Sequence, residues 1–313
     1  MTLLQRFRQL EAGGALNLPA PGSGKTAERH RRLLEIGRED LSLARLAEAH
    51  VDALAILSEA GGDPPAPGIL YGVWASESKQ HQLTLHCSDG KWLLSGIKMF
   101  CSGAGLVDRA LVTVRTPESR LLDVNLNGQA GAITMDSNDW KSTAFAETQT
   151  AIVTFNNIVV AEENFIREPN WYLTRPGFWH GACGPAACWA GGAIGLVDYA
   201  LTQARDDAHG LAHLGAMSAD EWALRTFLES AGREIDDHPD DPREAYIRAL
   251  RVRHLVVQAC NDVLSRLPRA FGPRPLAYDA DISRRCQELG LYITQSHAER
   301  DLESLGRKVL GRQ

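Results

Sequence analysis

The chain has 313 residues, 44% of them hydrophobic, which is enough to bury the cores of two or three domains. A net charge of −6 and a pI near 5.9 argue against nucleic acid as a partner, because nucleic-acid-binding surfaces need clustered basic residues. No apolar run has the roughly 18 residues of a membrane span, no signal peptide is apparent, and the six cysteines form no CxxC pair. We therefore expect a cytoplasmic protein with reduced thiols and no membrane partner.

The N-terminal residues predict a short helical domain over residues 1–68. A short helix and a loop ending in Gly24-Lys25-Thr26 come first. This tripeptide matches the end of a phosphate-binding P-loop, but that motif needs glycine at position 19, where the chain has proline, so a linker is favoured. Helices are expected over residues 28–34 and 40–60, with Asp40 as the cap of the second. A run rich in glycine and proline, residues 61–68, marks the domain boundary.

Residues 69–168 predict a central antiparallel β domain, a small barrel or sandwich. Leu83, Leu85 and Cys87 alternate with polar residues, which is the pattern of a half-buried strand. Asp89-Gly90 then predicts a hairpin turn. Further strands are expected over residues 92–100, 110–114, 121–126, 132–135 and 151–160.

Residues 169–313 predict a C-terminal four-helix bundle. The first helix, residues 178–205, is rich in glycine and alanine, whose small side chains permit close approach to a neighbour or a ligand. Three more helices are expected over residues 218–234, 242–267 and 281–310. The expected fold class is thus α+β multidomain, with a helical segment, a central antiparallel β-barrel and a helical bundle.

Two clusters have the residue types of a metal site, but neither predicts one. The acidic run at residues 236–241 lies at a helix end broken by proline, where carboxylates are usually solvated. His209 and His213 have helical spacing, but they lack a third ligand and Gly210 lies between them. We expect no metal.

Three segments in order carry a family resemblance: Trp74-Ala75-Ser76-Glu77, the run from Gly96-Ile97-Lys98 to Ser102-Gly103, and residues 151–160. Together, and with helices on both sides, they resemble the middle domain of the acyl-CoA dehydrogenase superfamily of flavoproteins. The resemblance implies an FAD cofactor whose isoalloxazine ring lies against the β domain, and it supports the expected fold.

The resemblance also implies cofactor-binding residues. Ser76 matches a hydroxyl that binds the pyrimidine end of the ring. Phe100, Cys101 and Ser102 match a strand and loop that place an aromatic residue and a second hydroxyl beside the ring, and these residue types keep both physical roles. Arg205, near the expected end of the first bundle helix, matches an arginine that could meet the pyrophosphate, although a surface arginine is the simpler interpretation.

Two departures from the family bear on activity. Many members carry their catalytic glutamate in a late Glu-Gly-Thr segment, and residues 292–301 of this chain contain none. Residues 78–81 also lack the glycine of the loop that helps to hold the thioester. His297 is the remaining candidate for proton transfer, with Asp301 four residues on to orient it, and His180 is a second candidate. A late histidine near the flavin is also a feature of the monooxygenase branch of the superfamily, and an exposed His–Asp pair is the structural alternative.

The resemblance leads first to an FAD-dependent oxidoreductase that resembles acyl-CoA dehydrogenases and oxidises an acyl-type or other small organic substrate. One alternative is a monooxygenase of the same fold that uses reduced flavin and oxygen. The other is a non-catalytic relative acting as a binding or assembly module, because fold alone does not decide function. Expected partners are the small-molecule substrate, an electron-transfer or reductase protein, and further copies of the chain in a homodimer or homotetramer.

Overall fold

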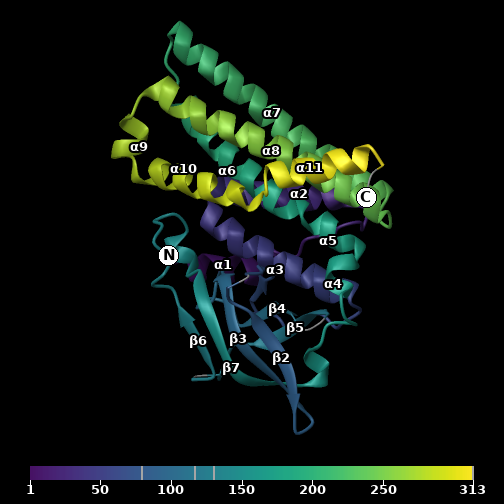
Figure 1. Cartoon of the computed structure of the whole chain (residues 1–313). Coiled ribbons are helices and arrows are strands. Elements are labelled where there is room, and N and C mark those ends of the chain that lie inside the picture. The colour runs from purple at the N-terminus through teal and green to yellow at the C-terminus, as the bar shows by residue number, and fades with distance from the viewer. Residues whose placement is uncertain (79, 116–117, 130, 312–313) are drawn as a thin grey trace. The chain divides into compact units, whose positions relative to one another are not determined.

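The computed structural model describes residues 1–78, 80–115, 118–129 and 131–311 (Figure 1). Lys79, within the expected loop at residues 78–81, lies outside the described residues. The chain forms two compact units, each built from two separate stretches of sequence. We call Met1–Asn17 with Ala49–Phe178 the β unit, and Leu18–Glu48 with Trp179–Gln313 the helical unit. The domain boundaries expected at residues 68 and 168 stay a prediction.

The strands of the β unit form two sheets. The first has the order β1-β4-β5, from β1 (Tyr71–Trp74), β4 (Arg109–Arg115) and β5 (Ser119–Asn125). The second has the order β2-β3-β7-β6, from β2 (Leu83–Ser88), β3 (Lys91–Cys101), β7 (Ala151–Val160) and β6 (Ile133–Asp136), which lie side by side in Figure 1. Asp89-Gly90 makes the expected hairpin: both residues have positive φ, and Ser88 pairs with Lys91.

The α+β class is confirmed, but two details of the expected barrel are not. Within the described residues the two sheets are open rather than closed into one barrel. The sheet is also not wholly antiparallel, because β1 pairs in parallel with β4, Tyr71 opposite Arg109. A parallel pair needs a long crossover, which the β2–β3 hairpin and its flanking loops supply here. Alternation of apolar residues indicates a strand but does not identify its partner.

Helices pack on the first sheet within the β unit, namely the later part of α3 (Leu41–Glu59) and α4 (Trp171–Thr174). Helix α1 (Leu3–Ala12) packs on α3, with the ring of Phe7 edge-on to His50. Ala53, Ile56 and Leu57 of α3 share a buried cluster with Tyr71, Leu111, Leu121 and Tyr172. The β unit also contains two short 3-10 turns, η1 (Ala146–Thr148) between β6 and β7 and η2 (Glu162–Asn164) after β7.

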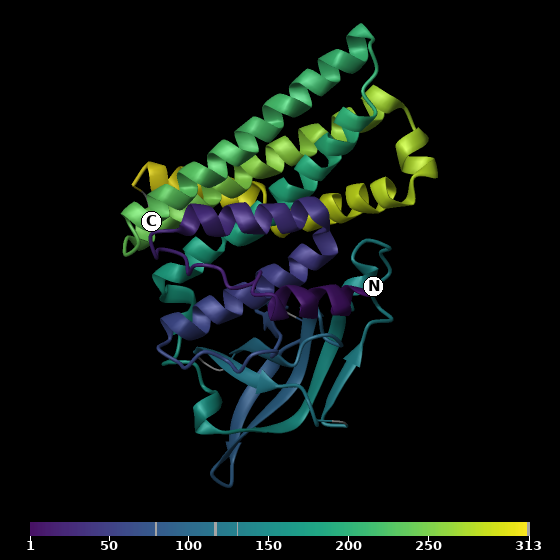
Figure 2. The same cartoon turned by 180° about the vertical axis from the view of Figure 1, so that it is seen from behind.

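The helical unit contains four long helices where the bundle was expected: α6 (Cys183–Thr202), α7 (Ala208–Asp237), α8 (Pro242–Phe271) and α10 (Ala280–Tyr292). A fifth, α2 (Thr26–Glu39), comes from the N-terminal part of the chain and packs on α6 and α7 (Figure 2). Shorter helices complete the unit: α5 (Pro176–Gly181), which starts in the β unit, α9 (Arg274–Tyr278) and α11 (Glu299–Val309). The helix expected over residues 281–310 is interrupted by the 3-10 turn η3 (Ile293–Gln295).

The acidic residues near the helix ends have structural partners. Asp236 accepts hydrogen bonds from the backbone and hydroxyl of Thr26, at 2.8 and 2.6 Å, and from the backbone of Gly24. Asp241 caps α8 by accepting from the backbone N–H groups of Arg243 and Glu244, both at 3.0 Å. The Gly24-Lys25-Thr26 loop therefore binds a carboxylate of its own chain. No helix within the described ranges is long and apolar enough to span a membrane.

Candidate functional site

An exposed aromatic ring stands near the end of strand β3. Two residues of β3, Met99 and Phe100, oppose one of β7, because Lys98 pairs with Val153 and Cys101 with Ala151. This bulge puts Phe100 at a φ of 58° and leaves it 57% exposed. A bulge redirects side chains locally, so the aromatic face points away from the core. An exposed phenylalanine with left-handed backbone geometry is uncommon, which makes this position a candidate for ligand contact.

Ser102 is tied to the neighbouring elements by its backbone and its hydroxyl. The indole N–H of Trp74, the last residue of β1, donates to the carbonyl of Ser102 at 3.1 Å. The hydroxyl of Thr150 donates to the Ser102 hydroxyl at 3.2 Å. Ser76 follows β1 and is exposed. The Trp74 bond thus links the segment that carries Ser76 to the segment that carries Phe100 and Ser102.

A small hollow of about 80 Å³ lies beside Phe100. Its wall combines Phe100 and Met99 with Thr150, Trp140 and two carboxylates, Asp136 and Asp139. Carboxylates repel a phosphate, whereas an uncharged ring can lie against Phe100. The chemistry of this wall fits the ring part of a flavin better than its phosphate.

Lys98 joins the two sheets behind this position. The Lys98 side chain is 3% exposed, and its ammonium group donates to the Glu77 carboxylate at 3.0 Å and to the carbonyl and hydroxyl of Thr113, both at 2.8 Å. The Thr113 hydroxyl donates in turn to Glu77 at 2.7 Å. Burial lowers the pKa of Lys98, and the hydrogen bond to Glu77 opposes that shift. The sequence interpretation missed this residue, although Lys98 lies four positions after the buried Leu94 in an alternating strand and so shares its face.

Cys101 lies between the two proposed ring contacts, but its thiol is fully buried and lies 3.4 Å from the Lys98 carbonyl. Burial raises the pKa of this thiol to about 12, so it is a neutral core group. Any contact of Cys101 with a cofactor would therefore use its backbone.

In the helical unit, His297 lies in the interruption between η3 and α11. Its Nδ1 is 3.4 Å from a carboxylate oxygen of Asp301, and its backbone N–H donates to the same carboxylate at 3.1 Å. The His297 side chain is 66% exposed. The expected His–Asp pair is therefore present, at the start of α11 rather than inside a long helix. Arg253 supports this turn by donating to the carbonyls of Ala182 and Gln295, both at 3.0 Å.

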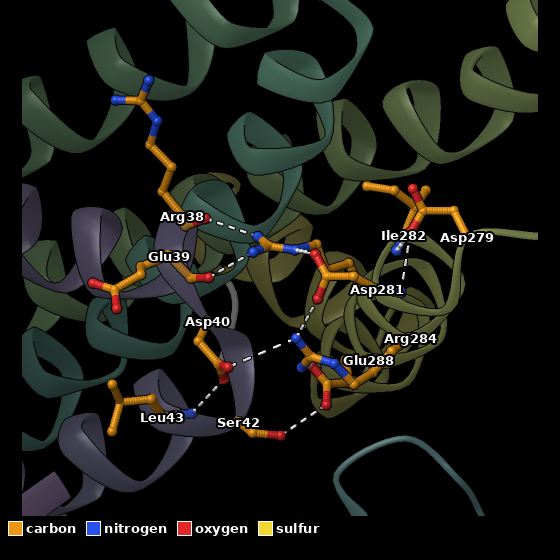
Figure 3. Close-up of polar contacts among 11 residues, drawn as sticks. Arg38, Glu39, Asp40, Ser42, Leu43, Asp279, Asp281, Ile282, Arg284 and Glu288 are labelled. Carbon is orange, nitrogen blue, oxygen red and sulfur yellow. Dashed lines mark hydrogen bonds and ion pairs between the residues drawn. The ribbon is translucent and has the colours of Figure 1, made fainter. Parts of the chain in front are cut away.

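A polar network fixes the helix that leads to His297 (Figure 3). Arg285 of α10 donates to the carbonyls of Arg38 and Glu39 at the end of α2, at 2.9 and 2.8 Å. Glu288, which is 2% exposed, accepts from the Ser42 hydroxyl at 2.7 Å and pairs with Arg284 at 2.8 Å. Burial raises the pKa of Glu288. The network ties α10 to the junction of α2 and α3.

Asp40, at this junction, accepts the backbone N–H of Leu43 at 2.9 Å, so the cap expected for α3 is confirmed.

Two other expected residues lie apart from this network. Arg205 follows the end of α6, is 64% exposed and pairs with Asp207 at 3.0 Å. His180 is buried and its Nε2 lies 2.8 Å from the carbonyl of Pro239. Their roles as phosphate ligand and proton-transfer group stay predictions.

Comparisons with known proteins give structural neighbours only. No family model matches the sequence, and no curated protein matches it. The dibenzothiophene monooxygenase TdsC from Paenibacillus sp. A11-2, in complex with FMN and indole, is 18% identical, with a TM-score of 0.77 over 99% of this chain and 95% of that chain. The nitrososynthase from Micromonospora carbonacea var. africana is 18% identical, with a TM-score of 0.84 over 99% and 90%. The methanesulfinate monooxygenase MsuC from Pseudomonas fluorescens is 18% identical, with a TM-score of 0.77 over 99% and 97%.

These neighbours are flavoproteins with the acyl-CoA dehydrogenase fold. The chain has the acyl-CoA dehydrogenase fold. The α+β fold implied by the sequence resemblance is thus confirmed over nearly the whole chain, without the closed barrel. At 18% identity the likeness concerns the fold, and the chemistry has to be argued from the residues.

Proposed function

We propose that this chain is a flavin-dependent oxidoreductase, and that it acts as a monooxygenase with reduced FMN and oxygen. The supporting observation is the exposed ring of Phe100, presented by the bulge of β3 in a fold whose structural neighbours include an FMN-bound monooxygenase. Dehydrogenase activity with FAD, which the sequence resemblance suggested first, is less well supported because the neighbours are monooxygenases and a nitrososynthase.

In this proposal the residues of the β unit bind the flavin ring. The face of Phe100 packs against it, and the hydroxyls of Ser76 and Ser102 bind its polar edge. Lys98 positions the segment that carries Ser76 through Glu77. The carboxylates of Asp136 and Asp139 direct the phosphate away from the hollow beside Phe100.

We propose FMN rather than FAD because the two cofactors differ in their phosphate groups. FMN has a single phosphate and no pyrophosphate, so it does not need the bidentate contact suggested for Arg205. That arginine already pairs with Asp207. A phosphate-binding role for Arg205 remains a proposal that applies only if the cofactor is FAD.

Reduced flavin supplies two electrons for the cleavage of oxygen, so that one oxygen atom enters the substrate and the other leaves as water. This chemistry needs no glutamate to remove a proton beside a thioester, which agrees with the absence of the Glu-Gly-Thr segment. We propose that His297, oriented by Asp301, transfers protons in this reaction. A separate reductase would supply the reduced flavin, and the substrate would be a small organic molecule.

Titration of the purified chain with FMN, followed by absorbance, tests the cofactor proposal. We expect saturable binding that is tighter for FMN than for FAD. Phe100→Ala should weaken FMN binding by about tenfold, because an aromatic contact contributes about 1 kcal/mol beyond the loss of buried area. Val159→Ala is the control, since Val159 is a 61% exposed residue of β7 outside the proposed site.

Equal FMN affinity for both variants and the unmodified chain would contradict the proposed site. The reaction class is tested by supplying reduced FMN and oxygen with indole or dibenzothiophene and analysing the products by mass spectrometry. Products that gain one oxygen atom support monooxygenase activity. Bleaching of bound flavin by an acyl-CoA thioester would instead support dehydrogenase activity.

A further inference from the structure

A groove in the helical unit runs between α2 and α7, which are antiparallel. The order of their contacts shows this: Thr26 binds Asp236, His30 lies 3.0 Å from the carbonyl of Leu228, and Glu35 pairs with Arg225 at 3.1 Å. The groove has a volume of about 540 Å³. Such a volume is typical of sites for small organic ligands.

The groove is cationic although the chain as a whole has a net charge of −6. Arg31, Arg225 and Arg233 line it, together with a single carboxylate, Glu229. Arg225 is held in place by Glu35 and by Glu221, the latter at 3.0 Å. The charge of Arg225 is thereby compensated, so Arg31 and Arg233 are the cationic groups that the groove offers to an anion.

Arg31 and Arg233 are able to bind a ligand. Arg233 pairs with Glu229 one turn away at 2.7 Å, but it is 72% exposed, and exposed pairs of this kind contribute little. Arg31 is exposed and makes no ion pair within the described part of the chain. Both guanidinium groups can offer paired N–H donors to a sulfonate, carboxylate or phosphate.

The rest of the wall is apolar and aromatic. Trp222 is 72% exposed at the groove, where Leu34 and Leu228 also contribute. His30 lines the groove too, and burial lowers its pKa to about 4, so it is neutral at physiological pH and adds no charge. An indole face beside guanidinium groups suits a flat ring that carries a negative charge.

We propose that the groove between α2 and α7 binds a small aromatic anion, with its ring against Trp222 and its anionic group on Arg31 and Arg233. All residues of this site belong to the helical unit, and none is among the flavin-binding residues proposed in the β unit. It does not depend on the identity of the reaction.

Anilinonaphthalene sulfonate, an aromatic sulfonate whose fluorescence rises on binding, is the probe that tests this proposal on the full chain. We expect saturable binding that weakens as salt is added, because the arginines are exposed. Arg31→Ala and Arg233→Ala should each weaken it by about tenfold, the effect of losing one charge-assisted hydrogen bond. Trp222→Ala should weaken both this probe and its uncharged analogue phenylnaphthylamine, whereas the arginine variants should affect only the sulfonate.

Arg32→Ala is the matched control and should leave affinity unchanged. Arg32 also lies on α2 and is 44% exposed, but it pairs with Glu28 at 2.6 Å and does not line the groove. Phe100→Ala should also bind the sulfonate normally. Near-ultraviolet circular dichroism of each variant establishes that binding is to folded protein.

Unchanged sulfonate affinity in folded Arg31→Ala and Arg233→Ala would overturn the proposal. A second outcome would also overturn the proposal. If Trp222→Ala lowered the molecular mass measured by light scattering and left the sulfonate affinity unchanged, the groove would be covered by a second copy of the chain.

Discussion

At the scale of single residues, two buried histidines make the fold sensitive to acid. His30 is 1% exposed and His50 2%, and burial lowers the pKa of each to about 4. The ring of His50 accepts the backbone N–H of Tyr71 at 3.1 Å, which requires an unprotonated Nδ1. Both imidazoles are thus neutral in the folded chain, whereas in the unfolded chain they titrate near 6.5.

The sign of the pH effect follows from these values. Below about pH 6.5 these histidines become protonated in the unfolded chain, whereas in the folded chain they stay neutral down to about pH 4. Their contribution to stability is therefore present at neutral pH and is lost as the pH falls between these values. Each histidine should lower the free energy of unfolding by about 2 kcal/mol between about pH 7 and about pH 5. Urea unfolding at both pH values measures this loss.

The variants His30→Asn and His50→Asn should each reduce the loss, because asparagine can replace the Nδ1 hydrogen bond without titrating. His86→Asn is the control, since His86 is exposed on β2. The explanation fails if the pH dependence of all three variants equals that of the unmodified chain.

The sequence predicted the strand that carries the candidate site, because its signals are local: Phe100 lies near the end of β3 and Ser102 directly after it. The assignment of these residues to a flavin came from the family resemblance and stays a prediction. The bulge that exposes Phe100 depends on pairing with β7, which no local signal reveals. The interruption before α11 was missed because Ala298, at a φ of 46°, is a residue type that gives no indication of left-handed geometry.

At the scale of elements, the crossing of α2 and α6 depends on small residues. A Cβ at Gly191 of α6 would collide with the Leu34 carbonyl and lie 2.7 Å from the amide nitrogen of Arg38. A Cβ at Gly37 of α2 would lie 2.5 Å from the carbonyl oxygen of Cys188. The small side chains of the first bundle helix thus permit close contact with a neighbouring helix.

Gly191→Ala should therefore destabilise the chain by about 3 kcal/mol, because the atoms in its way belong to the backbone and cannot rotate aside. Gly215→Ala in α7 is the matched control: no heavy atom lies within 4 Å of its added Cβ, so it should stabilise by about 1 kcal/mol through helix propensity. Thermal unfolding of both variants measures the difference. Equal and small effects would show that the crossing can relax.

Helix boundaries were less predictable than helix existence. The helix expected from residue 218 begins at Ala208, because Asp207 caps it by accepting the backbone N–H of Gly210 at 2.8 Å. Gly210 counted against a helical metal pair in the sequence, but tertiary packing and the Asp207 cap outweigh the small propensity cost of this glycine. His209 and His213 accordingly lie on a helix, and His213 is 3.5 Å from Arg266.

At the scale of the whole molecule, helices that are distant in the sequence belong to the same structural unit. The sequence predicted α2 as a helix but assigned it to an N-terminal domain, because apolar periodicity identifies a buried face without identifying what covers it. In the structure α2 belongs to the helical unit, held by Thr26 to Asp236 and by Arg38 to Asp198.

A fragment of residues 169–313 should consequently fail to form a rigid structure, since the faces of α6 and α7 that pack on α2 would be exposed. Adding residues 18–48 through a flexible linker should restore it. Near-ultraviolet circular dichroism and the cooperativity of thermal unfolding distinguish the two fragments. A shorter fragment that unfolds as cooperatively as the longer one would contradict this prediction.

The early position of α2 in the chain also affects how the protein is made. During synthesis α2 leaves the ribosome on the order of ten seconds before α6, at ordinary translation rates. Leu33 and Leu34 of α2, both buried in the finished protein, have no partner helix in that interval. The nascent chain must therefore keep the apolar face of this amphipathic helix from aggregating until α6, nearly two thirds of the way along the polypeptide, emerges. That face is the expected binding site for a chaperone during translation.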